Sequence, residues 1–210
     1  MSKDNLGFVH RFVPSNNGSS LTLLLLHGTG GDENDLVPIA KELDPSASIL
    51  SPRGKVLENG MPRFFRRISE GVFDLRDLEH RTSELADFVL ASMKEYELQP
   101  DRVVVVGYSN GANLAANILL QRANVLAGAI LFRPMLPMEP GSLPDLRSGR
   151  VFISSGTLDN VIPRESTARL VETLKQSGAD VKMVSQAAGH GLVLGDIKDA
   201  KKWLKEHFIE

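Results

Sequence analysis

The chain has 210 residues, of which 42% are hydrophobic and 24% are charged, and its formal net charge is −2. This size and composition are typical of a globular protein with one core, and we expect a single domain over residues 1–210. The small net charge gives no reason to expect nucleic acid or an anionic membrane as a partner. Because the chain has no cysteine, disulfides and thiolate metal sites are excluded.

The N-terminal segment MSKDNLGFVHRF lacks the long apolar core of a secretory signal. No later stretch has the length and apolar character of a membrane-spanning helix. The absence of cysteine fits a reducing compartment. Together these features predict a cytoplasmic protein.

Apolar runs alternate with amphipathic stretches through the N-terminal half. Residues 8–14 and 21–28 are predicted strands, and the second of them leads into the glycine-rich segment GTGGDEND. Residues 35–43 have the apolar spacing of a helix, residues 47–52 form a short predicted strand, and residues 78–98 form a long predicted helix.

The same alternation continues through the C-terminal half. The predicted elements are strands at 103–106, 126–134, 151–156 and 181–186, and helices that begin at Asn110 and span about 165–176 and 196–208. Strands that alternate with helices predict an α/β fold with a mostly parallel central sheet and helices on both faces. Because parallel crossovers are right-handed, the loops at the carboxyl ends of the strands gather at one edge, where we expect the functional site.

Two segments show no regular pattern and are predicted to leave the sheet at that edge. The first, residues 53–76, contains five arginines. We expect Arg53, Arg66 and Arg67 to reach the site, where a guanidinium group can bind a substrate carboxylate or phosphate. The alternative is a solvated basic surface.

The second irregular segment, residues 134–149, contains four prolines. Its apolar side chains include Met135, Leu136 and Met138, which we expect to wall an acyl-binding pocket. Prolines at this density favour a fixed wall over a mobile helical lid. We therefore expect no large cap domain.

A serine stands at the junction between a predicted strand and a predicted helix. Gly107, Ser109 and Gly111 match the G-x-S-x-G nucleophile elbow, in which a tight turn exposes the serine hydroxyl. Side chains at the two glycine positions would collide with the neighbouring chain. The helix that follows directs free N–H groups and the positive end of its dipole toward the serine. The alternative is a plain strand-to-helix turn.

A serine hydroxyl becomes a good nucleophile only when a base takes its proton. Of the five histidines, His190 lies in a loop after the last predicted strand, among small residues, and follows the serine in the chain order of this elbow. We predict His190 as the base. His27 ends the second strand, where we expect it to stabilise a turn, and His10, His80 and His207 are expected to face solvent.

The base in turn needs a carboxylate that holds its tautomer. Asp159 comes directly after a predicted strand, between Ser109 and His190 in the chain, and is our candidate. Asp145 in the proline-rich segment is the main alternative. Asp180 precedes its strand and is therefore expected at the opposite edge of the sheet.

Acyl transfer also needs donors for the oxyanion of the tetrahedral intermediate. We predict the backbone N–H groups of Asn110, directly after the nucleophile, and of Thr29, in the glycine-rich segment. Such a segment can also bind phosphate, but the patterns G-x-x-x-x-G-K-[ST] and G-x-G-x-x-G do not occur in the chain. Nucleotide binding is therefore disfavoured.

Four motifs in order, LLLLHGTGGDENDL, VVVVGYSNGANLA, SSGTLDNVIP and AAGHGL, resemble the α/β-hydrolase superfamily, in its small phospholipase/carboxylesterase (acyl-protein thioesterase-like) family. Within that family the first two motifs are most similar to a bacterial branch of hydrolases associated with quinone and hydroquinone stress. The resemblance implies an α/β-hydrolase fold and a serine hydrolase of esters or thioesters, often a homodimer. GYSNGA in place of the thioesterase elbow GFSQGG disfavours lipidated proteins as substrates.

We therefore predict a carboxylic ester hydrolase that needs no metal or cofactor and acts on a small-molecule ester. Ser109 attacks the acyl carbonyl, His190 takes its proton and Asp159 orients His190. One alternative is a lactone hydrolase of the dienelactone type in aromatic-compound metabolism, although such enzymes commonly carry a cysteine nucleophile. Another is a non-catalytic ligand-binding homologue, which the presence of all three residues disfavours.

Overall fold

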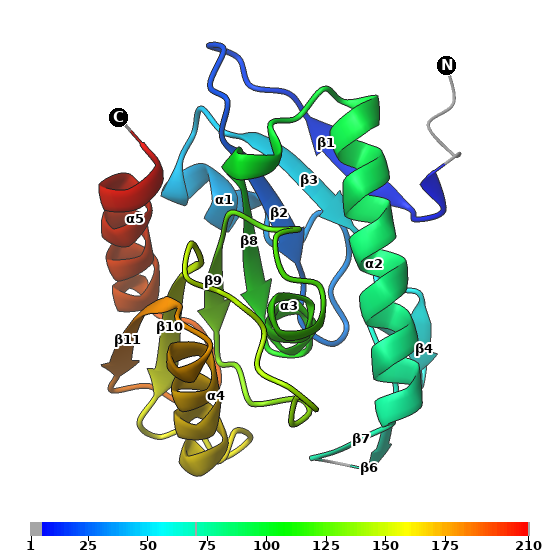
Figure 1. Cartoon of the computed structure of the whole chain (residues 1–210), viewed down its shortest axis with the longest axis vertical. Helices are drawn as coiled ribbons and strands as arrows, with labels where there is room; N and C mark the ends of the chain where they lie inside the picture. The colour runs from blue at the N-terminus through cyan, green and yellow to red at the C-terminus, as the bar shows by residue number, and fades with distance from the viewer. Residues whose placement is uncertain (1–5, 70, 210) are drawn as a thin grey trace.

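In the computed structural model, which describes residues 6–69 and 71–209, the chain forms a mixed α/β structure (Figure 1). The main sheet has seven strands in the order β1-β3-β2-β8-β9-β10-β11. Strand β1 pairs with β3 antiparallel, and all other neighbours pair parallel. The predicted fold class is confirmed. Residues 1–5, part of the N-terminal segment considered above, lie outside the described residues.

The elements have the following bounds. The strands of the main sheet are β1 (His10–Val13), β2 (Thr22–Leu26), β3 (Ser48–Pro52), β8 (Val103–Tyr108), β9 (Gly128–Phe132), β10 (Arg150–Gly156) and β11 (Asp180–Gln186). The helices are α1 (Val37–Leu43), α2 (Leu75–Glu95), α3 (Asn110–Gln121), α4 (Arg164–Gln176) and α5 (Leu194–Phe208), with a 3₁₀ turn at Pro100–Arg102. Two small hairpins pair β4 (Val56–Glu58) with β5 (Met61–Arg63), and β6 (Arg67–Ser69) with β7 (Val72–Phe73).

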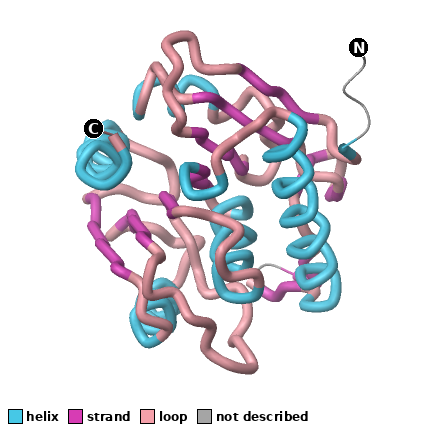
Figure 2. Tube along the Cα trace, turned by 45° about the horizontal axis from the view of Figure 1, so that its top comes forward, coloured by secondary structure: helices cyan, strands magenta, loops and turns pink. Residues whose placement is uncertain are grey.

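Helices cover the sheet on both faces, which divides the core into two apolar clusters. Helices α2, α3 and α4 lie on one face and α1 and α5 on the other (Figures 1 and 2). Because side chains alternate along a strand, Leu24 of β2 packs in the first cluster and Leu25 in the second. Val105 and Val106 of β8 divide in the same way. This two-sided burial is the reason that both strands are continuous apolar runs.

The arginine-rich segment is more regular than its sequence suggests. The expectation that residues 53–76 lack regular structure is wrong, since they contain the two hairpins and the first residues of α2. The strands of these hairpins are only two or three residues long, too short for a recognisable alternation of polar and apolar side chains. Residues 134–149, in contrast, contain no helix or strand, and among the described residues no large cap covers the sheet.

The carboxyl ends of the parallel strands meet at one edge, toward the bottom of Figure 1. There the four neighbouring strands β8, β9, β10 and β11 are followed by Ser109, Arg133, Asp159 and His190 in turn. The hairpin of β6 and β7 lies at the same end of the molecule. Among the described residues, no helix combines the length and apolarity that crossing a membrane would require.

Candidate active site

Ser109 occupies a strained turn between β8 and α3. Its φ angle is +52°, a region that side-chain-bearing residues rarely adopt and that costs about 1–3 kcal/mol. A Cβ atom at Gly107 would lie 2.7 Å from the Cα of Ala112, and one at Gly111 would overlap the carbonyl oxygen of Leu26. The two glycines are therefore required by the close approach of β2, β8 and α3, as the elbow pattern predicts.

Ser109, His190 and Asp159 form one hydrogen-bonded chain. The Nε2 atom of His190 lies 2.9 Å from the Oγ of Ser109, and its Nδ1 atom lies 2.9 Å from the Oδ2 of Asp159. An ionised carboxylate can only accept, so the proton of a neutral His190 ring belongs on Nδ1. That tautomer leaves Nε2 free to accept the proton of the serine hydroxyl. The arrangement has the geometry of a nucleophile, a base and an orienting acid.

The Asp159 carboxylate is held in its charged form by hydrogen bonds. Its side chain is 3% exposed, and its Oδ1 accepts hydrogen bonds from the backbone N–H groups of Val161 and Ile162, at 2.8 and 3.1 Å. Burial by itself raises the pKa of Asp159, but the hydrogen bonds from His190 and these two N–H groups outweigh it, so the pKa lies below its ordinary value.

The alternative acids lie elsewhere. Asp145 is exposed and pairs with Arg147, whose hydrogen bond lowers the pKa of Asp145 to about 2. Asp180 is the first residue of β11, so it lies at the edge opposite to the carboxyl ends of the strands. Neither residue contacts His190, and Asp159 alone of the three candidates does.

The other histidines have structural roles or face solvent. In the buried His27 ring, Nδ1 donates to the carbonyl of Gly28 at 2.7 Å, and Nε2 accepts from the N–H of Gly54 at 3.0 Å. Burial lowers the pKa of His27, which favours this neutral form. His80 is exposed as expected.

For the two terminal histidines the expectation of a solvent-facing ring is wrong. Both are half-buried, because His10 bonds the hydroxyl of Tyr96 and His207 bonds the carbonyl of Trp203.

A cavity of about 250 Å³ opens beside Ser109. Among the predicted site residues, those that line it are Thr29, Arg67, Ser109, Asn110, Met135 and His190. The remaining lining residues were not predicted from the sequence; they are Arg63, Gly71, Phe73, Tyr108, Asn113, Val161 and Ile162. The glycine-rich segment after β2, the β6–β7 hairpin and the loops after β8, β9 and β10 therefore all contribute to its wall.

Two of the predicted arginines lie outside this cavity. Arg53 forms a two-pronged ion pair with Glu33, through contacts of 2.5 and 2.7 Å, and does not line the cavity. Arg66 is exposed, and its backbone N–H donates a hydrogen bond to the carboxylate of Asp77 at the start of α2. The expectation that both guanidinium groups reach the site is therefore wrong.

Arg63 lies in the cavity wall, where Arg53 and Arg66 were expected. Its side chain is 5% exposed, donates to the Oγ1 of Thr29 at 2.9 Å and lies 3.2 Å from a carboxylate oxygen of Glu58. Arg67 pairs with the same carboxylate at 2.7 Å and is 31% exposed. Burial lowers the pKa of Arg63, and the hydrogen bond from Arg67 lowers the pKa of Glu58. Two guanidinium groups thus share one carboxylate at the cavity, which leaves a local excess of positive charge.

The apolar wall is smaller than predicted. Met135 lines the cavity, whereas Leu136 and Met138 do not and instead pack against the α2–α3–α4 side of the core. The backbone N–H of Met135 donates to Asn113 of α3, and that of Leu136 donates to Ser166 of α4. These anchors turn the chain away from Ser109 after Met135.

The predicted oxyanion donors belong to segments that are tied together. The N–H of Gly30 donates to the carbonyl of Pro62 in β5 at 2.9 Å, which fixes the turn that follows Thr29. The side chain of Asn110 accepts from the N–H of Phe64 at 2.8 Å, so the arginine-rich segment docks directly on the elbow. Both Thr29 and Asn110 line the cavity beside Ser109.

Comparisons with known proteins agree with this geometry. The model of the dienelactone hydrolase family matches residues 65–203. The protein MhqD of Bacillus subtilis (strain 168), named as a hydrolase, is 46% identical over 191 residues, which cover 91% of this chain and 96% of MhqD. These matches confirm the predicted α/β-hydrolase relationship.

Solved structures support the same relationship. A carboxylesterase from Bacillus cereus is 45% identical and superimposes with a TM-score of 0.94, over 97% of this chain and 96% of its own. YahD, solved with malic acid, is 33% identical with a TM-score of 0.89, over 95% of this chain and 99% of its own.

Proposed function

The chain belongs to the dienelactone hydrolase family of α/β-hydrolases, and on that premise we propose that it cleaves carboxylic esters through a covalent acyl-enzyme on Ser109. The observation that carries this proposal is the hydrogen-bonded chain from Ser109 through His190 to Asp159, beside an open cavity. Each contact is 2.9 Å long, which is within reach for direct proton transfer.

In the first half of the reaction, the Oγ of Ser109 attacks the acyl carbon while Nε2 of His190 takes the hydroxyl proton. The backbone N–H groups of Thr29 and Asn110 stabilise the oxyanion. The ester bond then breaks, and the alcohol leaves with the proton from His190. In the second half, His190 removes a proton from water, water attacks the acyl-enzyme, and the carboxylic acid departs as Ser109 regains its proton.

The substrate side of the proposal is a small ester with an anionic group. The excess positive charge of Arg63 and Arg67 next to Ser109 supports it, because guanidinium groups bind carboxylates through paired hydrogen bonds. The relative YahD was solved with malic acid, a dicarboxylic acid, which is consistent with such a preference. The cavity of about 250 Å³ suits a compact substrate.

Lactone hydrolysis is a second candidate, and the match to the dienelactone hydrolase family favours it. The same steps open a cyclic ester, with the alcohol remaining attached to the acyl group until water releases both. Initial rates on matched sets of esters, thioesters and lactones, with and without a carboxylate, decide between these substrate classes.

The nucleophile is tested with a fluorophosphonate probe, which captures an activated serine hydroxyl. We expect labelling and ester turnover in the wild-type protein, and loss of both in Ser109→Ala with little change in melting temperature. Persistent labelling or turnover in that variant would show that Ser109 is not the nucleophile. An absence of turnover in the wild-type protein, with every substrate class, would favour a ligand-binding role.

Two proposals concern organisation. The seven-stranded main sheet, whose strands run from β1 near the start of the described residues to β11 near their end, supports a single domain over residues 1–210, which should unfold in one cooperative transition. The family resemblance favours a homodimer, for which light scattering on the eluting protein gives the molar mass.

A further inference from the structure

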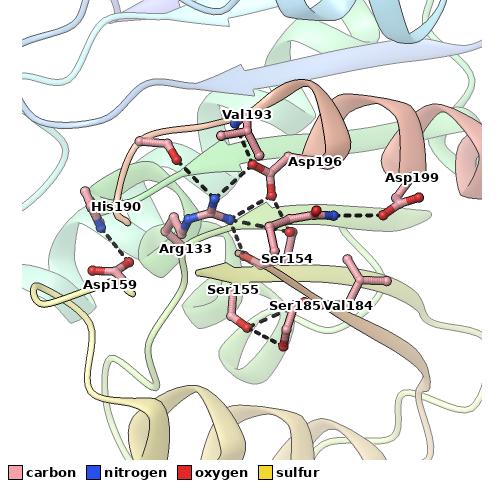
Figure 3. A network of polar contacts seen from close by, with 12 residues as sticks. Arg133, Ser154, Ser155, Asp159, Val184, Ser185, His190, Val193, Asp196 and Asp199 are labelled. Carbon is pink, nitrogen blue, oxygen red and sulfur yellow. Dashed lines mark hydrogen bonds and ion pairs between the residues drawn. The ribbon is translucent and has the colours of Figure 1, made fainter. Parts of the chain in front are cut away.

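An arginine and an aspartate are completely buried behind His190. The side chains of Arg133, which follows β9, and Asp196, in the first turn of α5, are both 0% exposed. Two parallel hydrogen bonds join them, from Nη1 to Oδ1 at 2.8 Å and from Nη2 to Oδ2 at 2.9 Å. Figure 3 shows the Arg133 guanidinium pointing toward the Asp196 carboxylate, with His190 and Asp159 to its left.

The carboxylate is satisfied by more than the arginine. The hydroxyl of Ser154 in β10 donates to its Oδ1 at 2.5 Å, and the N–H of Val193 donates to its Oδ2 at 2.7 Å. Asp196 therefore connects β10, the start of α5 and Arg133. A buried carboxylate that accepts this many hydrogen bonds holds the guanidinium in one orientation.

Nη1 of Arg133 also donates to the carbonyl of Ser154 at 3.3 Å, and two further N–H donors are directed at the loop that carries His190. Nε donates to the carbonyl of Gly189 and Nη2 to the carbonyl of Gly191, both at 3.1 Å. The hydroxyl of Tyr108 donates to the carbonyl of His190 itself at 3.2 Å. Three consecutive carbonyl groups, on and around His190, are thus each held by a side chain from the end of β8 or β9.

This arrangement compensates for a weakness of the loop. The segment between β11 and α5 contains no helix or strand, and Gly189 and Gly191 give it little intrinsic stiffness. The proposed reaction nevertheless requires the His190 ring to bridge Ser109 and Asp159 at hydrogen-bond distance. A displacement of about 1 Å at such a group costs roughly 100-fold in rate.

We propose that Arg133 is a positioning residue, which holds the His190 loop in its productive place through the carbonyls of Gly189 and Gly191 while Asp196 fixes the guanidinium. Arg133 does not touch the reacting atoms, and it does not line the cavity beside Ser109. The inference rests on the proposed function, because it assigns the loop a role in proton transfer.

The test separates positioning from stability with three variants. Asp196→Asn leaves the arginine and its bonds to both glycine carbonyls in place but removes the buried counter-charge. Arg133→Met removes those bonds and leaves a buried carboxylate unpaired. The double variant Arg133→Met with Asp196→Asn removes the bonds and leaves no unpaired charge, so its stability should exceed that of Arg133→Met.

We expect kcat to depend on the hydrogen bonds from Arg133 to the carbonyls of Gly189 and Gly191. The melting temperature should depend instead on whether a buried charge is left unpaired. In the double variant kcat should fall about 10- to 100-fold with little change in KM, although its melting temperature recovers relative to Arg133→Met. In Asp196→Asn the melting temperature should fall while kcat changes about threefold or less. A kcat that tracks the melting temperature across the three variants overturns the inference.

A control variant and a second readout complete the experiment. Arg102→Met removes an arginine that also donates to a backbone carbonyl, that of Phe208, but at the opposite edge of the sheet, and its kcat should equal that of the wild type. Hydrogen exchange of residues 187–193 gives a readout without turnover, and it should accelerate in the double variant more than in Asp196→Asn. Unchanged exchange in the double variant also overturns the inference. Turnover that survives in Ser109→Ala instead contradicts the proposed function.

Discussion

Two charged groups flank Ser109, one with a single arginine and one with two, and they differ in what surrounds them. Behind His190, the buried pair of Arg133 and Asp196 is fully enclosed, and each polar atom of the guanidinium contacts protein. On the cavity side, Arg63 and Arg67 share the single carboxylate of Glu58, and Arg67 is 31% exposed. The first group has no capacity left for a ligand, whereas the second retains donors and charge that a ligand can use.

The comparison shows that burial changes what an arginine does. Breaking an enclosed pair leaves a bare charge in the interior and destabilises a protein by about 3–5 kcal/mol. The partly exposed pair of Arg67 with Glu58 contributes only about 0–1 kcal/mol to stability, so Arg67 is available for recognition at little expense to the fold. We therefore expect loss of Arg133 on the histidine side to lower kcat for every substrate, and loss of Arg67 on the cavity side to affect the choice of substrate.

The largest effect is expected at Asp159. In Asp159→Asn the amide can present its N–H₂ group to His190, which favours the tautomer with the proton on Nε2 and leaves no acceptor for the serine proton. We expect kcat to fall about 10⁴-fold for neutral and anionic esters alike. The matched control is Asp145→Asn, which removes an exposed carboxylate paired with Arg147 and should retain wild-type kcat. Similar activity in the two variants would remove Asp159 from its role.

A smaller and selective effect is expected at Arg67. In Arg67→Ala, kcat/KM for an ester that carries a carboxylate should fall about 10- to 100-fold, because a charge-assisted hydrogen bond contributes about 1.5–3 kcal/mol. The rate for the neutral methyl ester of the same compound should change little. Arg53→Ala is the matched control, since Arg53 pairs with Glu33 outside the cavity. Equal losses on both esters would mean that Arg67 has only a structural role.

These two predictions separate what the sequence reveals about the site from what it does not. Ser109, Asp159 and His190 each follow a strand of a parallel sheet, so chain order and the elbow pattern bring them to one edge. The strands β2 and β8 can be recognised in the sequence because both are buried on two faces, which makes them apolar runs.

The cavity arginines could not be chosen from the sequence for a physical reason. Which of the five arginines of residues 53–76 faces the cavity depends on the pairing of β4 with β5, where Val56 lies opposite Arg63. It also depends on the distant carboxylate of Glu33, which draws Arg53 away.

The role of Arg133 could not be predicted from the sequence for a similar reason. In the sequence it is only the residue at the end of an apolar strand, before a proline. Its role depends on a backbone with a φ angle of +53° and on Asp196, which is 63 residues away in the chain. Long-range ion pairs of this kind leave no local pattern.

The pH dependence of stability tests one carboxylate on each side of Ser109, Asp159 on the histidine side and Glu58 on the cavity side. The pKa values of Asp159 and Glu58 are both lowered in the folded protein. Each ionised group therefore contributes stability above its unfolded pKa, about 3.9 for Asp and 4.3 for Glu, and this contribution is lost as the pH falls through the lower folded pKa. We expect Asp159→Asn and Glu58→Gln each to flatten the loss of unfolding free energy below about pH 4.5. Denaturant titrations from pH 7 to 3 measure the free energy of unfolding at each pH. If its pH dependence in the variants runs parallel to that of the wild type, the lowered pKa values are contradicted.

The smallest effect is expected when the substrate changes from dissolved to aggregated, because the reaction rate should then change little. Residues 134–149 contain no helix that could swing open, and the backbone at Met135 and Leu136 is anchored to α3 and α4. An enzyme with a mobile lid exposes a large apolar surface at a lipid interface, and its rate rises sharply when the substrate aggregates. With the wall of the cavity fixed on both sides, the rate on short- and medium-chain esters should saturate smoothly with concentration and show no jump at the solubility limit. The measurement is initial rate against concentration for esters of increasing chain length, across that limit. A sharp rise beyond it would mean that residues 134–149 move as a lid and that the wall beside Met135 is not fixed.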